Sequence, residues 1–337
     1  MNPIRLRAGI LLLALLAQPA VADTVSFDPP GSTFTMPLSM NDHGAVTGYW
    51  GGSPAKGFVR EPDGTFAMFD PPGSLETTPL GINNHGVIVG SYKDNADGFP
   101  HQHGFVRRPN GIIVSYDAPG SIDYTVIQAV NDKRSFTGYY RDRNDDTHGF
   151  LQDAAGHFAS FDVAGSLDTF GWHVNDEGAV TGYYAYLGHQ GPCGNLYFGG
   201  FVRAPDGTIT AFNVGDGEVA KSINAHGSVA GQYGDRGCHE HGFVRNADGT
   251  IKKFGYLGAD CCTYVSGINN RGTIVGNYID AQNAVHAYRR TRDGTFTLLE
   301  PDQRPKSETT AADINNSGQI LGTYADHDGL HGFIYTP

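Results

Sequence analysis

The chain is poor in cysteine, tryptophan and charge. Its 337 residues include 4 Cys and 2 Trp, and charged side chains make up only 17%. It has no Cys-x-x-Cys pair, Gly-x-Ser-x-Gly, His-Glu-x-x-His, glycine-rich phosphate loop or EF-hand loop. Those motifs would have indicated a zinc site, a nucleophilic serine, a nucleotide or calcium. We therefore expect no metal and no cofactor.

Clusters of basic residues are absent as well. The chain has 23 Lys and Arg against 35 Asp and Glu, for a net charge of −12. An acidic chain without basic patches argues against nucleic acid and against anionic membrane surfaces as partners. Beyond the first residues, no apolar stretch is long enough for a membrane helix, so we expect no membrane span.

Residues 1–22 have the pattern of a secretory signal peptide. Two arginines precede a short apolar run at residues 10–16, and Ala-Val-Ala at residues 20–22 offers a cleavage site. The apolar run is too short to span a bilayer, although an uncleaved anchor is the alternative. We expect a mature chain of residues 23–337 in the periplasm or outside the cell.

One cassette recurs seven times. It reads Ile-Asn-x-x-Gly, an apolar run into Gly-x-Tyr, then His-Gly-Phe-Val-Arg, then Asp-Gly-Thr and a closing Phe-Asp. Its period of about 46 residues is that of propeller blades and of some solenoids. The copies occupy all of residues 23–337, so we expect a single domain and a monomer. The glycine that precedes the aromatic residue is Gly48, Gly90, Gly138, Gly182, Gly231, Gly276 and Gly322.

Each cassette predicts four short strands. In the second copy these are residues 77–83, 87–92, 104–107 and 112–116, separated by Asn-His-Gly, a polar loop of variable length, and Pro-Asn-Gly. No segment has helical periodicity. A four-stranded sheet of this kind leaves both faces apolar, and packing it between two copies of itself buries both.

The two ends of the chain supply complementary parts of one cassette. The last copy stops after its third strand, at residues 331–335, and residues 24–28 resemble a fourth strand without a blade. Joining them would close a ring and cover an open sheet edge. The sequence therefore predicts an all-β, seven-bladed β-propeller closed by its N-terminal strand. A linear β-solenoid is the alternative, but it would not need matching fragments at its ends.

The cassette resembles the bacterial extracellular HAF repeat, named for His-Ala-Phe. The resemblance rests on Ile-Asn-x-x-Gly, Gly-x-Tyr and His-Gly-Phe, with His286-Ala287-Tyr288 in the sixth copy, and it covers essentially the whole mature chain. Most copies here have Gly where the family has Ala. The resemblance implies a secreted β-repeat protein, and it implies no defined chemistry and no site residues.

The four cysteines fall in loops on one face of the predicted ring. They are Cys193, Cys238 and the adjacent Cys261 and Cys262. An even number in an exported chain favours disulfides between blades. We prefer Cys193 and Cys238 each paired with one of the adjacent cysteines; the alternative is a Cys193–Cys238 bridge, which would leave Cys261 and Cys262 to form a strained bridge with each other. A metal site with the histidines that follow Cys238 lacks the spacing typical of zinc.

Five copies carry both a histidine at the start of the third strand and an aspartate just after the second strand, and two copies lack both. Residues that are lost together within one chain are expected to be in contact. We interpret them as structural hydrogen bonds that close the top loop of each blade, because catalysis needs one site and not five. The pairs are Asp94–His103, Asp142–His148, Asp235–His241, Asp280–His286 and Asp326–His331.

Departures from the repeat are the candidate ligand-binding residues. Six residues before the repeated asparagine, six copies have Thr and the fifth has Glu218. The inner strands also carry Trp172, His173, Lys221 and Asp313, where other copies have mostly small or apolar residues. Together they could bind a polar ligand or perform acid–base chemistry near one channel mouth, which we place on the face with the variable loops. The alternative is that Glu218 and Lys221 simply pair with neighbours.

Two functional classes follow from these observations. The first is a non-enzymatic propeller that binds a small polar ligand, a glycan or a protein. The second is a lyase or hydrolase that acts on a polysaccharide or a small extracellular compound at the channel mouth. We favour the first, because the sequence identifies no catalytic residue. The two differ in whether the polar exceptions converge on one pocket.

Overall fold

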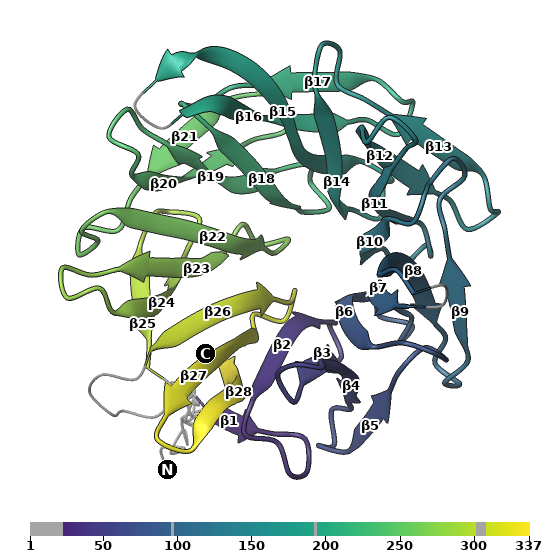
Figure 1. The fold of residues 1–337 in the computed structure, drawn as a ribbon. Helices are drawn as coiled ribbons and strands as arrows, with labels where there is room; N and C mark the ends of the chain where they lie inside the picture. The colour runs from purple at the N-terminus through teal and green to yellow at the C-terminus, as the bar shows by residue number, and fades with distance from the viewer. Residues whose placement is uncertain (1–22, 96–97, 192–193, 301–307) are drawn as a thin grey trace, which may run out of the picture.

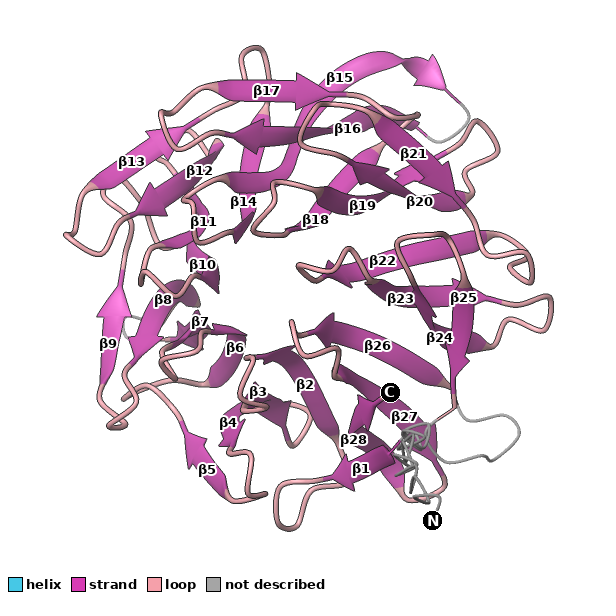
Figure 2. Ribbon diagram, turned by 180° about the vertical axis from the view of Figure 1, so that it is seen from behind, coloured by secondary structure: helices cyan, strands magenta, loops and turns pink. Residues whose placement is uncertain are grey.

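The computed structural model describes residues 23–95, 98–191, 194–300 and 308–337, without the side chains of residues 189–195. These residues form 28 strands and no helix, so no described helix could cross a membrane (Figure 2). The strands make seven four-stranded antiparallel sheets arranged as a ring (Figure 1). The predicted seven-bladed β-propeller is therefore confirmed.

Blades are numbered in chain order, each running outward from the centre of the ring. Blade 1 contains β2 (Thr35–Met40), β3 (Val46–Trp50), β4 (Lys56–Arg60) and β5 (Phe66–Phe69). Blade 2 contains β6 (Glu76–Ile82), β7 (Ile88–Asp94), β8 (His101–Arg107) and β9 (Ile113–Tyr116). Blade 3 contains β10 (Thr125–Val130), β11 (Phe136–Arg141), β12 (Thr147–Gln152) and β13 (Phe158–Phe161). Blade 4 contains β14 (Asp168–Val174), β15 (Val180–Gly191), β16 (Gly194–Arg203) and β17 (Ile209–Phe212).

The remaining blades follow the same order. Blade 5 contains β18 (Glu218–Ile223), β19 (Val229–Gly234), β20 (Glu240–Arg245) and β21 (Ile251–Phe254). Blade 6 contains β22 (Cys262–Ile268), β23 (Ile274–Ile279), β24 (Val285–Arg290) and β25 (Phe296–Leu299). Blade 7 contains β26 (Thr309–Ile314), β27 (Ile320–Asp326), β28 (Gly329–Thr336) and, as its outer strand, β1 (Asp23–Phe27).

Strand β1 closes the ring as predicted. It pairs antiparallel with β28, from Asp23 opposite Thr336 to Phe27 opposite Gly332. Figure 1 shows the purple N-terminal strand lying beside the yellow C-terminal strand. Main-chain hydrogen bonds between the two chain ends therefore hold blade 7 together, and the last sheet has no missing outer strand.

The core consists of apolar side chains packed between adjacent blades. The aromatic residue of the His-Gly-Phe motif is fully buried in all seven copies: Phe58, Phe105, Phe150, Phe201, Phe243, Tyr288 and Phe333. At five blade boundaries, the arginine of the same motif lies over a phenylalanine in the outer strand of the preceding blade, as Arg107 does over Phe69 at 4.8 Å. These cation–π contacts let an arginine be buried between sheets.

The seven repeated asparagines form a closed ring of hydrogen bonds, here called the asparagine ring. Each side-chain Nδ2 donates to the main-chain oxygen of the asparagine in the next blade, over 2.8–3.1 Å. The last step runs from Asn315 to Asn41, across the junction of blades 7 and 1. Within its own turn, the Oδ1 atom of each asparagine accepts bonds from main-chain N–H groups, as Asn83 does from Val87 at 2.9 Å. The structure shows that these residues also join every blade to the next.

All five predicted Asp–His pairs are in contact. Their closest nitrogen–oxygen distances run from 2.9 Å for Asp280–His286 to 3.6 Å for Asp142–His148. Every one of the five histidines also packs against the tyrosine of its Gly-x-Tyr motif. Three of them hold a second aspartate, from the closing Phe-Asp motif: Asp117, Asp162 and Asp28. These pairs join the second and third strands of each blade and not the inner strand that lines the channel, which supports a structural role.

The preferred disulfide pairing is wrong. Cys261 and Cys262 are both free thiols. They are adjacent in the chain, and the hydrogen bond between their sulfur atoms, together with burial, raises the pKa of Cys261 to about 11. Cys238 is not a free thiol, and Cys193 lies outside the described residues. Only the alternative Cys193–Cys238 pairing remains as a prediction.

Candidate functional site

Every inner strand contains a β-bulge at the same place. The register between first and second strands shifts by one residue in all seven blades. The extra residue is unpaired, and such bulges commonly redirect a side chain. These seven residues, here called the bulge ring, are Leu38, Leu80, Gln128, Trp172, Lys221, Ser266 and Ala312.

The bulge ring lines a cavity of about 470 Å³ in the central channel. The seven repeated asparagines line it as well, so the cavity lies at the end of the channel that is bounded by the tight turns. We had placed the site at the opposite end, on the face with the variable loops. The bulges bring Trp172, His173, Lys221 and Asp313 into this one cavity.

Trp172 and Lys221 face each other across the boundary of blades 4 and 5. The Lys221 Nζ atom lies 4.7 Å from the centroid of the Trp172 ring. Burial lowers the pKa of Lys221, and the negative charge of Glu240 partly opposes that effect. Lys221 forms no ion pair with another described residue. Among the described residues, it is also the only lysine or arginine that lines the cavity.

His173 and Asp313 are bound to the main chain of neighbouring strands. His173 Nδ1 accepts a hydrogen bond from the N–H of Ile223, at 3.4 Å, and burial lowers its pKa to about 4. The ring is therefore neutral near pH 7 and carries its proton on Nε2. Asp313 accepts from the N–H of Met40 at 2.9 Å and of Ile314 at 2.8 Å. Burial raises its pKa to about 6, even though these bonds favour the charged form.

Glu218 lies apart from the cavity. It is completely buried, and its Oε1 accepts hydrogen bonds from the N–H groups of Val214 and, at 2.6 Å, Gly215. In sister blades a threonine hydroxyl accepts the equivalent bond, as Thr169 does from Val163 at 3.1 Å. The other oxygen, Oε2, is buried with no described partner. Burial raises the Glu218 pKa to about 7. Glu218 is therefore a structural substitute for threonine.

A second ring of hydrogen bonds surrounds the mouth of the cavity and is incomplete. After six of the seven asparagines, the N–H of the following residue donates to the side chain of the equivalent residue in the next blade, over 2.7–2.9 Å. The step from Asp176 to Ala225 is missing among the described bonds, because alanine has no acceptor. The ring is therefore open between blades 4 and 5, the blades that carry Trp172 and Lys221.

An aromatic wall extends from this boundary. Phe170 stacks on Tyr183 with centroids 4.7 Å apart, and Trp172 lies 5.5 Å from Tyr183. Tyr139 of blade 3 meets Phe170 edge-on at 5.0 Å. Of these four rings, Trp172 lines the cavity and Tyr183 packs beside it, whereas blades 7, 1 and 2 contribute Ala312, Leu38 and Leu80 to the bulge ring.

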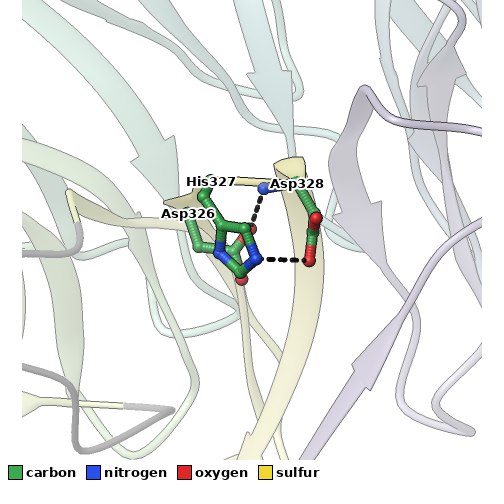
Figure 3. Close-up of side chains that lie close together, drawn as sticks. All are labelled: Asp326, His327 and Asp328. Atoms are coloured by element: carbon green, nitrogen blue, oxygen red, sulfur yellow. Dashed lines mark hydrogen bonds and ion pairs between the residues drawn. The ribbon is translucent and has the colours of Figure 1, made fainter.

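One group of described side chains has the donors for a metal ion. Asp326, His327 and Asp328 lie close together in the loop between β27 and β28 (Figure 3). His327 and Asp328 are exposed and bond each other at 3.2 Å, while Asp326 bonds His331 at 3.0 Å. The carboxylate of Asp326 thus already serves its Asp–His pair, and an exposed acidic loop alone does not indicate a metal site.

Sequence reasoning found four of the cavity residues and missed the features that organise them. The bulges have no sequence signature here, because the extra residue varies from Leu to Lys. The second aspartate beside three histidines could have been found, since the closing Phe-Asp motif is a repeat element like the others. The asparagine ring could have been suspected from the asparagine that occurs in all seven copies.

Solved structures resemble this chain in fold. No protein-family model and no curated protein matches the sequence. A streptogramin B lyase structure has 12% identity over 94% of this chain and 98% of its own, with a TM-score of 0.58. Virginiamycin B lyase from Staphylococcus aureus, solved with quinupristin, has 12% identity over 94% and 100%, with a TM-score of 0.56. The β-propeller domain of the Trilobed protease from Pyrococcus furiosus, which has an open velcro topology, has 9% identity over 90% and 93%, with a TM-score of 0.63. At these identities the likeness establishes the propeller fold alone.

Proposed function

We propose that this β-propeller is a non-enzymatic binding protein that holds a small anionic ligand in its central channel. The observation that carries the proposal is the contact between Lys221 and Trp172. A lysine that lines a cavity without a described ion-pair partner, in a chain of net charge −12, is available for an anionic group. The electron-rich ring of Trp172 stabilises the ammonium group in the absence of ligand.

The boundary of blades 4 and 5 also indicates the chemistry of the rest of the ligand. Trp172, packed against Tyr183, offers a flat apolar surface in the cavity, which suits a sugar ring or an aromatic ring. The second hydrogen-bond ring is open between Asp176 and Ala225, at the mouth nearest to these residues. A small compound that combines a carboxylate with a ring fits this arrangement.

Binding is favoured over catalysis because the titratable groups are already engaged. His173 and Asp313 both accept main-chain hydrogen bonds from a neighbouring blade, so each helps to hold blades together. They come from blades 4 and 7, and no described hydrogen bond joins them. A general base must reach the proton that it removes, and these two groups reach main-chain amides instead.

A lyase or hydrolase remains the second candidate. It rests on one observation: His173, with a pKa of about 4, and Asp313, with a pKa of about 6, are strongly perturbed groups that line one cavity. Lyases and a protease domain are among the solved structures of this fold. The two candidates differ in whether a bound ligand is recovered unchanged.

The tryptophans allow a direct test. The only other tryptophan is Trp50, and sister blades have tyrosine at its repeat position, so Trp50→Tyr leaves Trp172 as the only fluorescent tryptophan. We would titrate this variant with glucuronate, galacturonate and benzoate, follow Trp172 emission, and recover the compounds afterwards. We expect saturable quenching by at least one of them, and unchanged compounds.

Lys221→Met is the decisive variant, and Lys56→Met, which removes an exposed lysine paired with Asp70, is its matched control. We expect at least tenfold weaker binding in Lys221→Met and no change in the control. Equal affinity in both would overturn the proposed site. Chemical conversion of the ligand, lost in His173→Gln or Asp313→Asn, would favour the enzyme.

We also infer that the protein is an exported member of the HAF-repeat group and is monomeric. The inference rests on the composition of residues 1–22, which lie outside the described residues, and on the seven-fold cassette. Expression in a bacterial host followed by fractionation and N-terminal sequencing tests export. We expect a periplasmic or secreted chain that begins at Asp23. A cytoplasmic chain that retains Met1 would contradict it, and light scattering would report the mass in solution.

A further inference from the structure

A second cavity lies between blades 2 and 3, at a place where one residue is unusually small. The middle residue of the Gly-x-Tyr motif projects toward the next blade: Tyr139 meets Phe170 of blade 4, and Asn277 accepts a hydrogen bond from the N–H of Ala311 in blade 7. Blade 2 has Ser91 there, and serine cannot fill the same space. Across the seven blades the residues are Tyr49, Ser91, Tyr139, Tyr183, Gln232, Asn277 and Thr323.

The space beside Ser91 is a cavity of about 320 Å³. Ser91 is only 3% exposed, so it forms part of the inner wall and not of the surface. The Gln102 Nε2 atom donates to its hydroxyl at 2.8 Å. The side chains of Thr78 and Gln128 also line the cavity. This wall consists of neutral hydroxyl and amide groups, which can both donate and accept hydrogen bonds.

Two aromatic residues of blade 3 also line the cavity. Tyr124 and Tyr139 lie with centroids 6.3 Å apart and planes inclined by 31°. Arg141 lies over Tyr124 at 4.7 Å, which holds that ring in place. Rings held in this way offer flat faces against which the C–H groups of a sugar can pack.

The charged groups of the cavity neutralise each other. Glu76 and Lys93 form an ion pair at 2.7 Å, and both side chains are partly exposed, so the pair lies toward solvent. No other lysine, arginine, aspartate or glutamate in the part of the chain that the structure describes lines the cavity. A charged ligand would therefore lack an unpaired opposite charge among the lining residues. An uncharged ligand with several hydroxyl groups could form hydrogen bonds with Ser91, Gln102 and Gln128.

We propose that this cavity is a binding site for one neutral sugar ring. Its volume is at the small end of the range of ligand sites, which suits a monosaccharide unit and not a larger cofactor. Hydroxyl groups of the sugar bond Ser91, Gln102 and Gln128, and its apolar face packs on the tyrosines. The site is separate from Lys221 and does not depend on the function proposed for the channel.

The two cavities adjoin at the bulge ring. Leu80 and Gln128 line both of them. A glycan whose terminal unit lies beside Ser91 can therefore extend toward the channel. Oligosaccharides are therefore a second set of probes, to be used after single sugars have been tested at the site beside Ser91.

Sister blades supply substitutions that the fold already accepts. Ser91→Tyr introduces the residue that blades 1, 3 and 4 have at this position, and it fills the cavity. Gln128→Leu introduces the bulge-ring residue of blades 1 and 2, and it removes an amide without removing volume. Thr323→Tyr makes the equivalent change in blade 7, where Thr323 is 3% exposed like Ser91, and serves as the matched control.

The probes are glucose, galactose, mannose and N-acetylglucosamine, with glucuronate as the charged comparison. Saturation-transfer NMR detects contact with the mature protein, and calorimetry gives the affinity at millimolar sugar. We expect at least one neutral sugar to bind the unaltered protein and Thr323→Tyr equally. Ser91→Tyr should abolish binding, and Gln128→Leu should weaken it at least fivefold.

Three results would overturn the proposal. The first is that no neutral sugar binds the unaltered protein. The second is that Ser91→Tyr folds and binds with unchanged affinity; if that variant does not fold, unchanged affinity in Gln128→Leu has the same meaning. The third is that glucuronate binds at this site more tightly than glucose. Lys221→Met should leave sugar binding unchanged, so a failure here is distinguishable from a failure at the channel.

Discussion

His331 in the last strand lies between two aspartates from opposite ends of the chain. Its Nδ1 is 2.7 Å from Asp28, just after β1, and its Nε2 is 3.0 Å from Asp326, at the end of β27. Burial alone would lower the His331 pKa, but these two hydrogen bonds and the charges behind them raise it above the usual value. The contact with Asp28 therefore adds a charge-assisted bond to the main-chain pairing that closes the ring.

Ring closure is expected to weaken at alkaline pH. A folded-state pKa above the unfolded value gives stabilisation that is complete below the unfolded pKa, about 6.5, and is lost as pH rises through the folded value. His331→Gln should lower the free energy of unfolding by roughly 1 kcal/mol at about pH 6, and by less at about pH 9. Denaturant unfolding at the two pH values measures this. An equal loss at both would contradict it, and His327→Gln is the control in the neighbouring loop.

The histidines with two aspartates are expected to couple unequally to them. His148 lies 2.9 Å from Asp162 but 3.6 Å from Asp142. Double-mutant cycles should therefore give a coupling of about 0.5–1 kcal/mol for His148–Asp162 and a smaller one for His148–Asp142. Ligand binding should be intact in all of these variants. A larger coupling to Asp142, or loss of binding without loss of fold, would argue against a purely structural pair.

Glu218 is expected to make the protein less stable as pH rises from acid to neutral. Its folded pKa of about 7 lies above the value of 4.5 for the free side chain, so its stabilisation is present below about pH 4.5 and is lost as pH rises toward 7. Glu218→Thr restores the repeat residue. The unfolding free energy of this variant minus that of the unaltered protein should rise by about 2–3 kcal/mol from about pH 4.5 to pH 8. A difference that does not change with pH would mean that Glu218 is not buried as described.

The native protein is expected to contain two free thiols. Cys261 and Cys262 are reduced in the structure, and the raised pKa of Cys261 makes its thiolate scarce near neutral pH. Alkylation followed by mass spectrometry should label these two residues under denaturing conditions, and slowly in the native state. A Cys193–Cys238 bridge should appear in non-reducing peptide maps. Four labelled cysteines without prior reduction would contradict that bridge, and a link to Cys261 or Cys262 would contradict the free pair.

Ring architecture was predictable because the repeat encodes it redundantly. Seven cassettes and two matching end fragments specify both the blade number and the closure by β1, whatever the individual side chains are. The Asp–His pairs were predictable for a related reason: blades 1 and 4 lack both residues, and that joint loss indicates a contact.

The site was only partly predictable, because it depends on side-chain direction and on empty space. The bulge makes consecutive residues, Trp172 and His173, line the same cavity, although alternation along a strand predicts opposite faces. Its departure from the repeat predicts Glu218 as a ligand-binding residue, yet in the structure its longer side chain accepts the main-chain hydrogen bonds that threonine accepts in sister blades. The cavity beside Ser91 exists because a small side chain leaves space against the next blade. The sequence shows that Ser91 is small, but it does not show how closely the neighbouring blade packs there.

The asparagine ring has a consequence for the electrostatics of the channel. All seven amide groups point the same way around the ring, each toward the following blade. Dipoles that circulate head to tail around a closed path have components that cancel, so the ring adds almost no net field along the axis. The potential that a ligand meets there is therefore set by a few individual side chains that line the cavity: the ammonium group of Lys221 and the carboxyl groups of Asp42, Asp132, Asp176 and Asp313. Replacing Lys221 removes the positive charge among these groups and should make the channel less favourable for anions, without disturbing the hydrogen bonds that the aspartates accept from its walls.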